Sequence, residues 1–269
     1  RYFIDLRDIF SETISDFFSR KSKFLGSASR LVFSFLEGQL FDKAAGVNVV
    51  SEGFPGYFQE QGVDTSSWSF FPNGVDKEFI NLSLVRRNHS QYIKTILYAG
   101  NIGNGQGLET VLPAVAKRMG SGYRFLVIGG GSASSKLINA IKKENINNIE
   151  ILPPVKRDKL MVHYQDADIL FLHLNDIPAF KRVLPSKIFE YTALRKPIVA
   201  GLRGYSAQFM ADNVPNSIVF EPGDVEGCVD AIRKIEKLDV KNEVRDVFVK
   251  KYSREKIMNR MAEHIFSVL

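Results

Sequence analysis

Residues 184–200 have the sequence LPSKIFEYTALRKPIVA, which predicts a helix followed directly by a buried strand. Ser186 is a residue type that caps helices, and Pro185 restrains the backbone where the chain enters. Lys187 adds a cation where unpaired backbone N–H groups and the positive end of the helix dipole already favour an anion. The stretch therefore predicts a helix start that can hold a phosphate.

Glu190 lies one turn beyond this start, on roughly the same face of the predicted helix as Ser186. A carboxylate there would face whatever binds just beyond the phosphate, and carboxylates commonly hydrogen-bond sugar hydroxyls. A phosphate site beside a hydroxyl acceptor indicates a nucleotide or nucleotide-sugar ligand. An ordinary capped surface helix would show the same pattern, so this stretch by itself leaves both interpretations open.

The composition is that of a globular protein, since 45% of the 269 residues are apolar and 25% are charged. A single cysteine, Cys228, excludes an intrachain disulfide framework and favours a reducing compartment, so we expect a cytoplasmic protein. The four histidines are scattered, so no metal site is predicted. No apolar run could span a bilayer, and the missing initiator Met predicts that the chain is cut at its beginning.

The formal net charge of +6 suits anionic partners, either nucleotide phosphates or an acidic membrane surface. Nucleic acid is not predicted, because the basic residues are spread along the chain and do not alternate with aromatic ones.

From Lys94 onward, β-rich runs alternate with helical patterns, beginning with a strand at 95–99 and a helix at 108–119. Such alternation predicts an α/β fold with a parallel, doubly wound sheet, plus the remainder of a second domain of the same kind. We expect residues 1–80 to form that remainder, 81–93 a linker, 94–240 the ligand-binding domain and 241–269 two C-terminal helices.

Two glycine loops follow predicted strands, GNIGNGQG at 100–107 and GGGS at 129–132. In a doubly wound sheet, ligands bind beyond the carboxyl ends of the strands, and both loops and the Ser186 helix start fall at that edge. The glycine spacing matches neither a dinucleotide fingerprint nor a P-loop. Both loops could cradle a phosphate or simply make tight turns.

Three ordered motifs, FPNGVD (71–76), LYAG (97–100) with its glycine loop, and residues 184–199, resemble a large family of retaining glycosyltransferases. The resemblance covers about Ala44 to the end. Within that family, the wording YAGNIG and LPSKIFEY is similar to transferases that build O-antigen or capsule, and so is DLRD at 5–8.

The resemblance implies a GT-B fold, in which two Rossmann-like domains face across a cleft. The second grips a nucleotide-diphospho sugar, UDP- or GDP-linked, and needs no other cofactor. The first, of which roughly half is missing here, holds a carbohydrate or polyprenyl-linked acceptor, and a final helix returns to it. By the same resemblance, Glu190 bonds the donor's ribose, the amides of Ser186 and Lys187 approach the diphosphate, and Pro154-Val155 contacts the base.

The chain departs from the family pattern at two places. Arg182 stands where the family often has a first Glu, and Asn101 and Gln106 replace the usual basic pair of the first loop. We therefore expect Lys187, Lys181 and Arg182 to neutralise the diphosphate, unless the last two only form a solvated loop. Asp8 lies near the position of the family's first-domain histidine and is a second catalytic candidate. The remaining predicted binding residues are Gly100, Gly103, Gln106 and Gly130.

These observations predict transfer of a sugar from a nucleotide-diphospho sugar to a carbohydrate or lipid-linked acceptor, retaining and metal-independent, in surface polysaccharide biosynthesis. A binding module without turnover and a sugar-nucleotide epimerase are the alternatives. Peripheral membrane contact is a further hypothesis, because the basic run at 20–23 precedes apolar residues up to Leu36. Packing inside the first domain would explain that order equally well.

Overall fold

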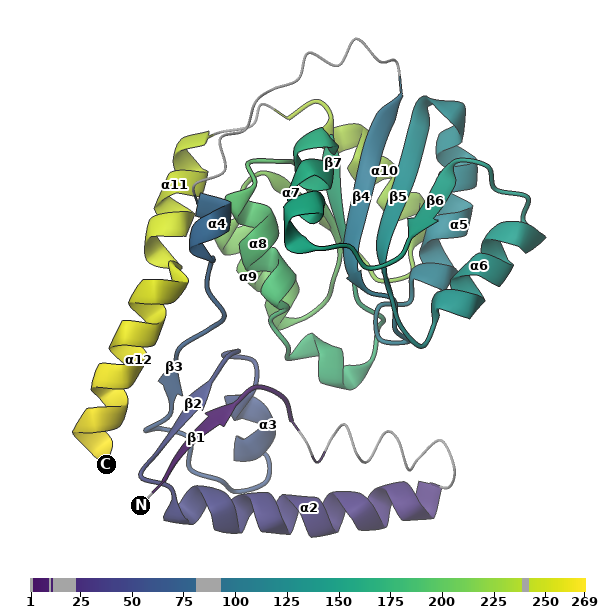
Figure 1. The fold of residues 1–269 in the computed structure, drawn as a ribbon. Coiled ribbons are helices and arrows are strands. Elements are labelled where there is room, and N and C mark those ends of the chain that lie inside the picture. Colours follow the sequence, from purple (N-terminus) through teal and green to yellow (C-terminus); the bar gives the residue numbers. More distant parts are fainter. Residues whose placement is uncertain (1, 10, 12–22, 81–92, 239–241) are drawn as a thin grey trace.

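The computed structural model describes residues 2–9, 11, 23–80, 93–238 and 242–269, which form two parallel sheets (Figure 1). The larger sheet places its first strand in the middle, with later strands on both sides, so the predicted doubly wound topology is confirmed. Its strand order is β6 (Ile149–Leu152), β5 (Tyr123–Gly130), β4 (Lys94–Asn101), β7 (Ile169–His173), β8 (Ile198–Gly201) and β9 (Ser217–Phe220).

Helices cover both faces of this sheet, which explains why its strands are apolar without alternation. In β4, Ile96 and Tyr98 belong to the core on one face, and Leu97 and Ala99 to the core on the other. The first face carries α5 (Leu108–Met119), α6 (Ser134–Lys143) and α10 (Val225–Ile235). The second face carries α7 (Arg157–Asp166), α8 (Ser186–Ala193) and α9 (Tyr205–Asn213). Two short 3-10 turns, η1 (Gly120–Gly122) and η2 (Pro178–Lys181), complete this lobe.

The smaller sheet has the strand order β1-β2-β3 and its own core. The elements of this lobe are β1 (Phe3–Leu6), α2 (Lys23–Lys43), β2 (Gly46–Val49), α3 (Pro55–Gln59) and β3 (Ser69–Phe70). Phe54, Tyr57 and Phe58 are almost completely buried, and the Phe58 ring lies 5.0–5.2 Å from those of Phe41 and Trp68. Aromatic packing therefore stabilises a lobe whose sheet is small.

Two segments of the chain, α4 (Lys77–Ile80) and the C-terminal helices, connect the two lobes. The helix α4 places Phe79 in the core of the larger lobe. From α11 (Asn242–Lys251), beside α8, the chain passes into α12 (Arg254–Val268), whose His264 ring contacts Phe3 and Phe71 of the smaller lobe (Figure 1). The predicted linker lies almost entirely outside the described residues.

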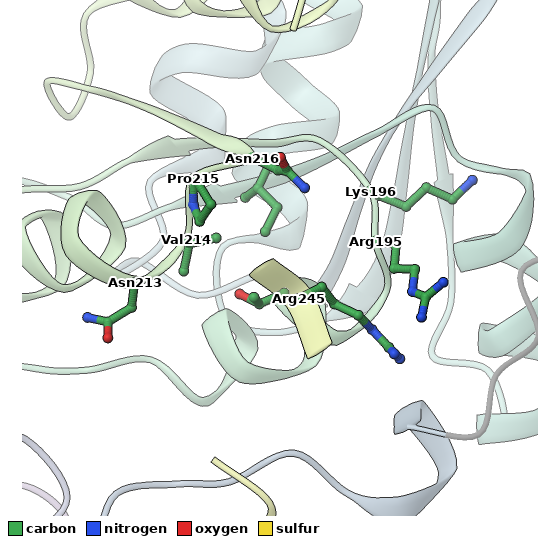
Figure 2. Close-up of a pocket in the computed structure, with 9 residues that line it drawn as sticks. Arg195, Lys196, Asn213, Val214, Pro215, Asn216 and Arg245 are labelled. Atoms are coloured by element: carbon green, nitrogen blue, oxygen red, sulfur yellow. The ribbon is translucent and has the colours of Figure 1, made fainter. Parts of the chain in front are cut away.

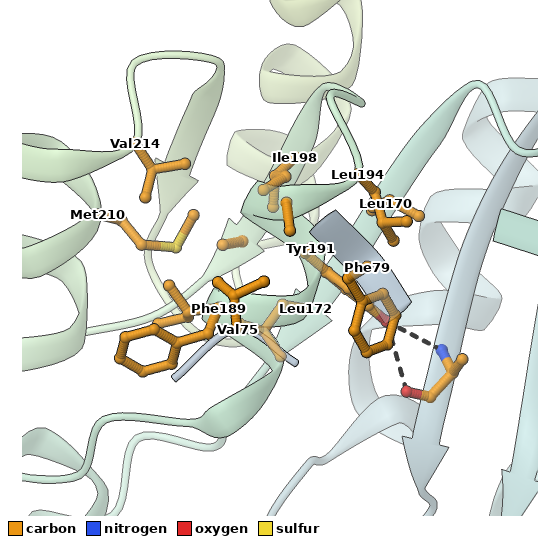
Figure 3. Packing of buried hydrophobic residues seen from close by; sticks show 14 of the residues in the cluster. Val75, Phe79, Leu170, Leu172, Phe189, Tyr191, Leu194, Ile198, Met210 and Val214 are labelled. Atoms are coloured by element: carbon orange, nitrogen blue, oxygen red, sulfur yellow. Dashed lines mark hydrogen bonds between the residues drawn. The ribbon is translucent and has the colours of Figure 1, made fainter. Parts of the chain in front are cut away.

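Phe189 of α8 connects this helix to the helices that follow it. Its ring is fully buried and lies 5.5–5.9 Å from the rings of Phe209, Phe248 and Tyr252. Figure 3 shows it among the side chains of this core.

We predict that Phe189→Ala lowers the free energy of unfolding by about 3–5 kcal/mol, because it removes a ring from a filled core. At about 2–4 °C per kcal/mol, thermal denaturation would show a Tm decrease of roughly 6–20 °C. Phe266→Ala is the control, since that ring is 86% exposed and its removal should leave Tm nearly unchanged. Equal losses in the two variants would contradict the assignment of Phe189 to the core.

Candidate functional site

A cavity of about 320 Å³ opens at the carboxyl ends of β4 and β5. It includes five of the residues predicted from the sequence, namely Gly100, Gly130, Pro154, Val155 and Lys187. The other lining residues are Ala99, Asn101, Ile128, Gly129 and Leu160. The floor is therefore glycine backbone, and Lys187 supplies a cation at the wall.

Glycine is required where the ends of β4 and β5 approach each other. Gly129 has a φ of 153°, and a Cβ on it would collide with the carbonyl oxygen of Gly100. The backbone N–H of Ile102 donates to the Gly130 oxygen at 2.9 Å, and the N–H of Ala133 donates to the Ile102 oxygen at 2.9 Å. The two glycine loops thus support each other and hold the cavity floor in one conformation.

The first glycine loop is closed by its own amide side chains. The Gln106 Oε1 accepts hydrogen bonds from Asn101 Nδ2 at 3.2 Å and from the N–H of Gly103 at 3.1 Å. Gly107, at a φ of 57°, leaves no room for a Cβ beside the Asn175 side chain. The residues Asn101 and Gln106 are uncharged, so this loop is ordered by amide hydrogen bonds.

His173 holds this loop in place through hydrogen bonds, a role that the sequence analysis did not predict. Its Nδ1 bonds the Gln106 carbonyl oxygen at 2.6 Å, and its Nε2 accepts from the N–H of Gly223 at 2.9 Å. Since Nε2 accepts, Nδ1 carries the proton, and the ring is neutral. Burial also favours the neutral ring, because desolvation of the charged form lowers the pKa of His173. The only sequence signal was a histidine at the end of a buried strand.

The helix α8 begins one residue earlier than the cap prediction assumed, so the prediction that Ser186 caps it is wrong. Pro185 has the extended backbone of a cap residue, and Ser186 is the first helical residue without a side-chain cap bond. Proline is pre-set for the φ of −60° observed there. Ser186 therefore offers its backbone N–H at the helix start.

Lys187 and Glu190 form an ion pair on α8, with Nζ 2.9 Å from Oε2. Both side chains are about one-fifth exposed, and the Tyr164 hydroxyl lies 3.4 Å from the same Nζ. Lys187 lines the cavity, and its partner Glu190 is held beside it. A cation and a carboxylate therefore lie beside each other near the start of α8.

The other predicted residues are not among those that line the cavity, namely Asp8, Gly103, Gln106, Lys181, Arg182, Ser186 and Glu190. The Arg182 guanidinium lies 5.1 Å from the Tyr57 ring centroid, and its carbonyl accepts the Ser51 hydroxyl, so this residue joins the lobes. Lys181 pairs with Asp176 at 3.3 Å. Asp8 follows β1 in the smaller lobe, and desolvation raises the pKa of its carboxyl.

A second pocket, at the amino ends of β8 and β9, holds only about 10 Å³ (Figure 2). It is lined by Arg195, Lys196 and Arg245 among others, but Arg245 donates to the carbonyls of Ala193 and Phe79 at 2.7 and 3.2 Å. Such a volume barely admits one water. Lys196 also donates to a backbone carbonyl, that of Gln165, and Arg195 pairs with Asp246. Across the described residues, no cluster of three or more metal-ligating side chains occurs. None of the described helices is long and apolar enough to cross a membrane.

A doubly wound sheet with glycine loops at its carboxyl edge, joined to a smaller parallel sheet, defines a two-lobed Rossmann-like protein of GT-B type. The family model for glycosyl transferases group 1 matches residues 86–255, more than half of the chain. The chain belongs to this family.

Three individual proteins are similar to this chain. The chain is 24% identical over 254 residues to the putative colanic acid biosynthesis glycosyl transferase WcaI of Escherichia coli K12, covering 89% of this chain and 61% of WcaI. It resembles the solved structure of Anabaena Alr3699/HepE in complex with UDP, with a TM-score of 0.75, 15% identity, and coverage of 98% and 72%. The lipopolysaccharide galactosyltransferase WaaB has a TM-score of 0.64, 14% identity, and coverage of 84% and 63%. The chain thus spans about three-fifths of the length of WcaI.

We predict that protonation of His173 makes the stability of the folded protein depend on pH. Its pKa is lowered in the folded protein, so the unfolded chain binds the proton more tightly. The stabilisation is complete above about pH 6.5 and is lost as the pH falls below that value. Between pH 7.5 and 5.5, the Tm of the wild type should therefore fall more than that of His173→Gln in thermal denaturation. Parallel Tm profiles for the two proteins would contradict the neutral, buried ring.

Proposed function

We propose that this chain is the donor-binding part of a retaining glycosyltransferase that moves a sugar from a nucleotide-diphospho sugar to a carbohydrate or lipid-linked acceptor. Surface polysaccharide biosynthesis is the proposed context, supported by the similarity to a putative colanic acid glycosyl transferase, WcaI, and to the lipopolysaccharide galactosyltransferase WaaB. The observation that carries the proposal is the 320 Å³ cavity, with glycine backbone as its floor and, on its wall, Lys187, which is ion-paired with Glu190.

In this proposal, each part of the cavity holds one part of the donor. The N–H groups at the start of α8 and the Lys187 ammonium bind the diphosphate, Glu190 accepts the ribose hydroxyls, and Pro154-Val155 contacts the base. Negative charge develops on the diphosphate as the sugar leaves, and fixed N–H dipoles and a cation stabilise that charge. These groups neutralise charge without a metal ion, which is why metal independence is part of the proposal.

The donor base is uracil or guanine, and UDP is favoured because solved structures of HepE contain UDP or UDP-glucose. Asp8 is proposed as a group on the acceptor side, because it lies in the smaller lobe and a carboxyl of raised pKa suits proton transfer. Two alternatives stay open, a module that binds nucleotide without turnover and a sugar-nucleotide epimerase. Calorimetry with UDP and GDP, followed by assays for sugar transfer and epimerisation, distinguishes all three.

We predict that Glu190→Ala weakens binding of the preferred nucleotide sugar by about 10- to 100-fold, because it removes charge-assisted hydrogen bonds to the ribose. Isothermal calorimetry measures the change. Glu144→Ala is the matched control, since Glu144 also pairs with a lysine at 2.9 Å, but its partner Lys117 does not line the cavity as Lys187 does. An unchanged affinity in Glu190→Ala would refute the ribose assignment.

Peripheral membrane contact is a second proposal, and it would place the chain at the inner face of the membrane. Helix α2 exposes Val32, Phe35, Leu36 and Leu40, at 48–67% of their surface, and their spacing of three and four places them on one stripe. Of the basic run at 20–23, residues 20–22 lie outside the described part of the chain. An apolar stripe near basic residues suits an anionic lipid surface.

We predict that the double variant Phe35→Ser/Leu36→Ser reduces sedimentation with vesicles containing anionic phosphatidylglycerol, because burial of these side chains would contribute to binding. Val247→Ser is the control, since Val247 is as exposed as Phe35 but lies on α11. Wild-type sedimentation that does not depend on anionic lipid would remove this proposal and favour packing of the stripe against protein.

A further inference from the structure

The strands β4 and β7 separate at the edge where the cavity opens. Their pairing ends at Leu97 and Leu170, although β4 continues to Asn101 and β7 to His173. Over these last residues, β4 stays paired with β5, and β7 stays paired with β8. The backbone groups of β4 that point toward β7 therefore lose their strand partner beyond Leu97.

Ala99 is the first residue of β4 affected by this separation. Because N–H and C=O groups of alternate residues point to the same side of a strand, Ala99 follows Leu97 in pointing toward β7. Ala99 is 2% exposed, so water does not replace the missing partner. A buried N–H and C=O without partners would be strongly destabilising.

The Tyr191 hydroxyl takes the place of that partner. It accepts a hydrogen bond from the Ala99 N–H at 3.1 Å and donates one to the Ala99 oxygen at 3.4 Å. Both bonds are drawn in Figure 3, where the Tyr191 side chain extends from α8 toward β4. The ring is fully buried, and the Tyr164 ring packs against it edge-on at 5.8 Å.

Tyr191 belongs to the same helix as the ion pair between Lys187 and Glu190. Tyr191 follows Glu190 directly and lies one turn after Lys187, so a bond from its hydroxyl to β4 fixes the position of both along the sheet edge. The Lys187 side chain reaches the backbone of Gly100, since its Cε lies 3.4 Å from the position of a Cβ there. The spacing between Gly100 and α8 sets the width of the cavity.

We propose that Tyr191 is a positioning residue for donor binding: its hydroxyl holds β4 and α8 at the separation that lets Gly100, Lys187 and Glu190 bind one nucleotide diphosphate together. The inference rests on the proposed function, which it deepens by naming what sets the geometry of the site. A tyrosine that only filled the core would need its ring but not its hydroxyl.

The test is Tyr191→Phe, which keeps the ring and removes the hydroxyl. Thr192→Val is the matched control, because Thr192 is the next residue of α8, is 8% exposed, and donates only to the Ile188 carbonyl of its own helix at 2.6 Å. Both variants lose one buried hydroxyl from α8, but only the first loses a bond to β4. The readouts are UDP affinity by calorimetry, Tm, and amide hydrogen exchange of the peptide that contains Ala99.

We expect Tyr191→Phe to weaken UDP binding about tenfold, since small displacements of positioning groups can reduce activity by up to about a hundredfold. Exchange at Ala99 should become faster in the same variant. Both variants should lower Tm by a few degrees, but Thr192→Val should leave UDP affinity and Ala99 exchange unchanged.

Two outcomes would overturn the proposal. Unchanged UDP affinity and Ala99 exchange in Tyr191→Phe would show that the hydroxyl sets no spacing, and equal weakening of UDP binding in both variants would show general loosening of α8. A wild-type chain that binds neither UDP nor GDP would overturn the proposed function and the donor part of this inference. In that case, Ala99 exchange would still decide whether the hydroxyl bonds β4.

Discussion

Where parallel strands separate at their carboxyl ends, their backbone N–H and C=O groups lose their strand partners and need others. The candidate site depends on how this chain supplies those partners. The strands β4 and β7 separate there, so each freed group needs a bond from a side chain or a loop. Tyr191 supplies the partner for Ala99, and His173 joins the loops that follow β4 and β9. The residues that open the cavity edge are therefore also the residues that stabilise it.

The electrostatics of the site are concentrated at one helix start. The first glycine loop contributes neutral amides, with Asn101 and Gln106 bonded to each other, and Lys181 is paired with Asp176 away from the cavity. Lys187 is the cation among the residues that line the cavity, and it is held by Glu190. A ligand diphosphate would compete with this carboxylate for the ammonium group, so binding would exchange one ion pair for another.

Close backbone contacts join the two lobes. A Cβ at Gly53 would meet the Arg182 carbonyl, and a Cβ at Gly74 would meet the backbone of Arg254. Val75 donates to the Tyr252 oxygen at 2.7 Å, and Arg254 donates back to the Val75 oxygen at 3.0 Å. These contacts involve main-chain atoms, so they fix the crossing of α12 from one lobe to the other whatever side chains surround it.

The sequence alone determined the α/β class, the strand and helix positions of the larger lobe within one or two residues, and the stretch 184–200 at the ligand edge. It could do so because apolar periodicity, glycine loops and helix starts are local signals that parallel topology brings to one edge. Gly100, Gly130 and Lys187 could be predicted for that reason, whereas Pro154 and Val155 were predicted only from the resemblance to the family. Only the tertiary structure decided that Pro185 rather than Ser186 precedes the helix, that Arg182 stacks on Tyr57, and that His173 and Tyr191 satisfy freed backbone groups. Those roles depend on partners 67 and 92 residues away in the chain, and no local pattern encodes a hydrogen bond across such a separation.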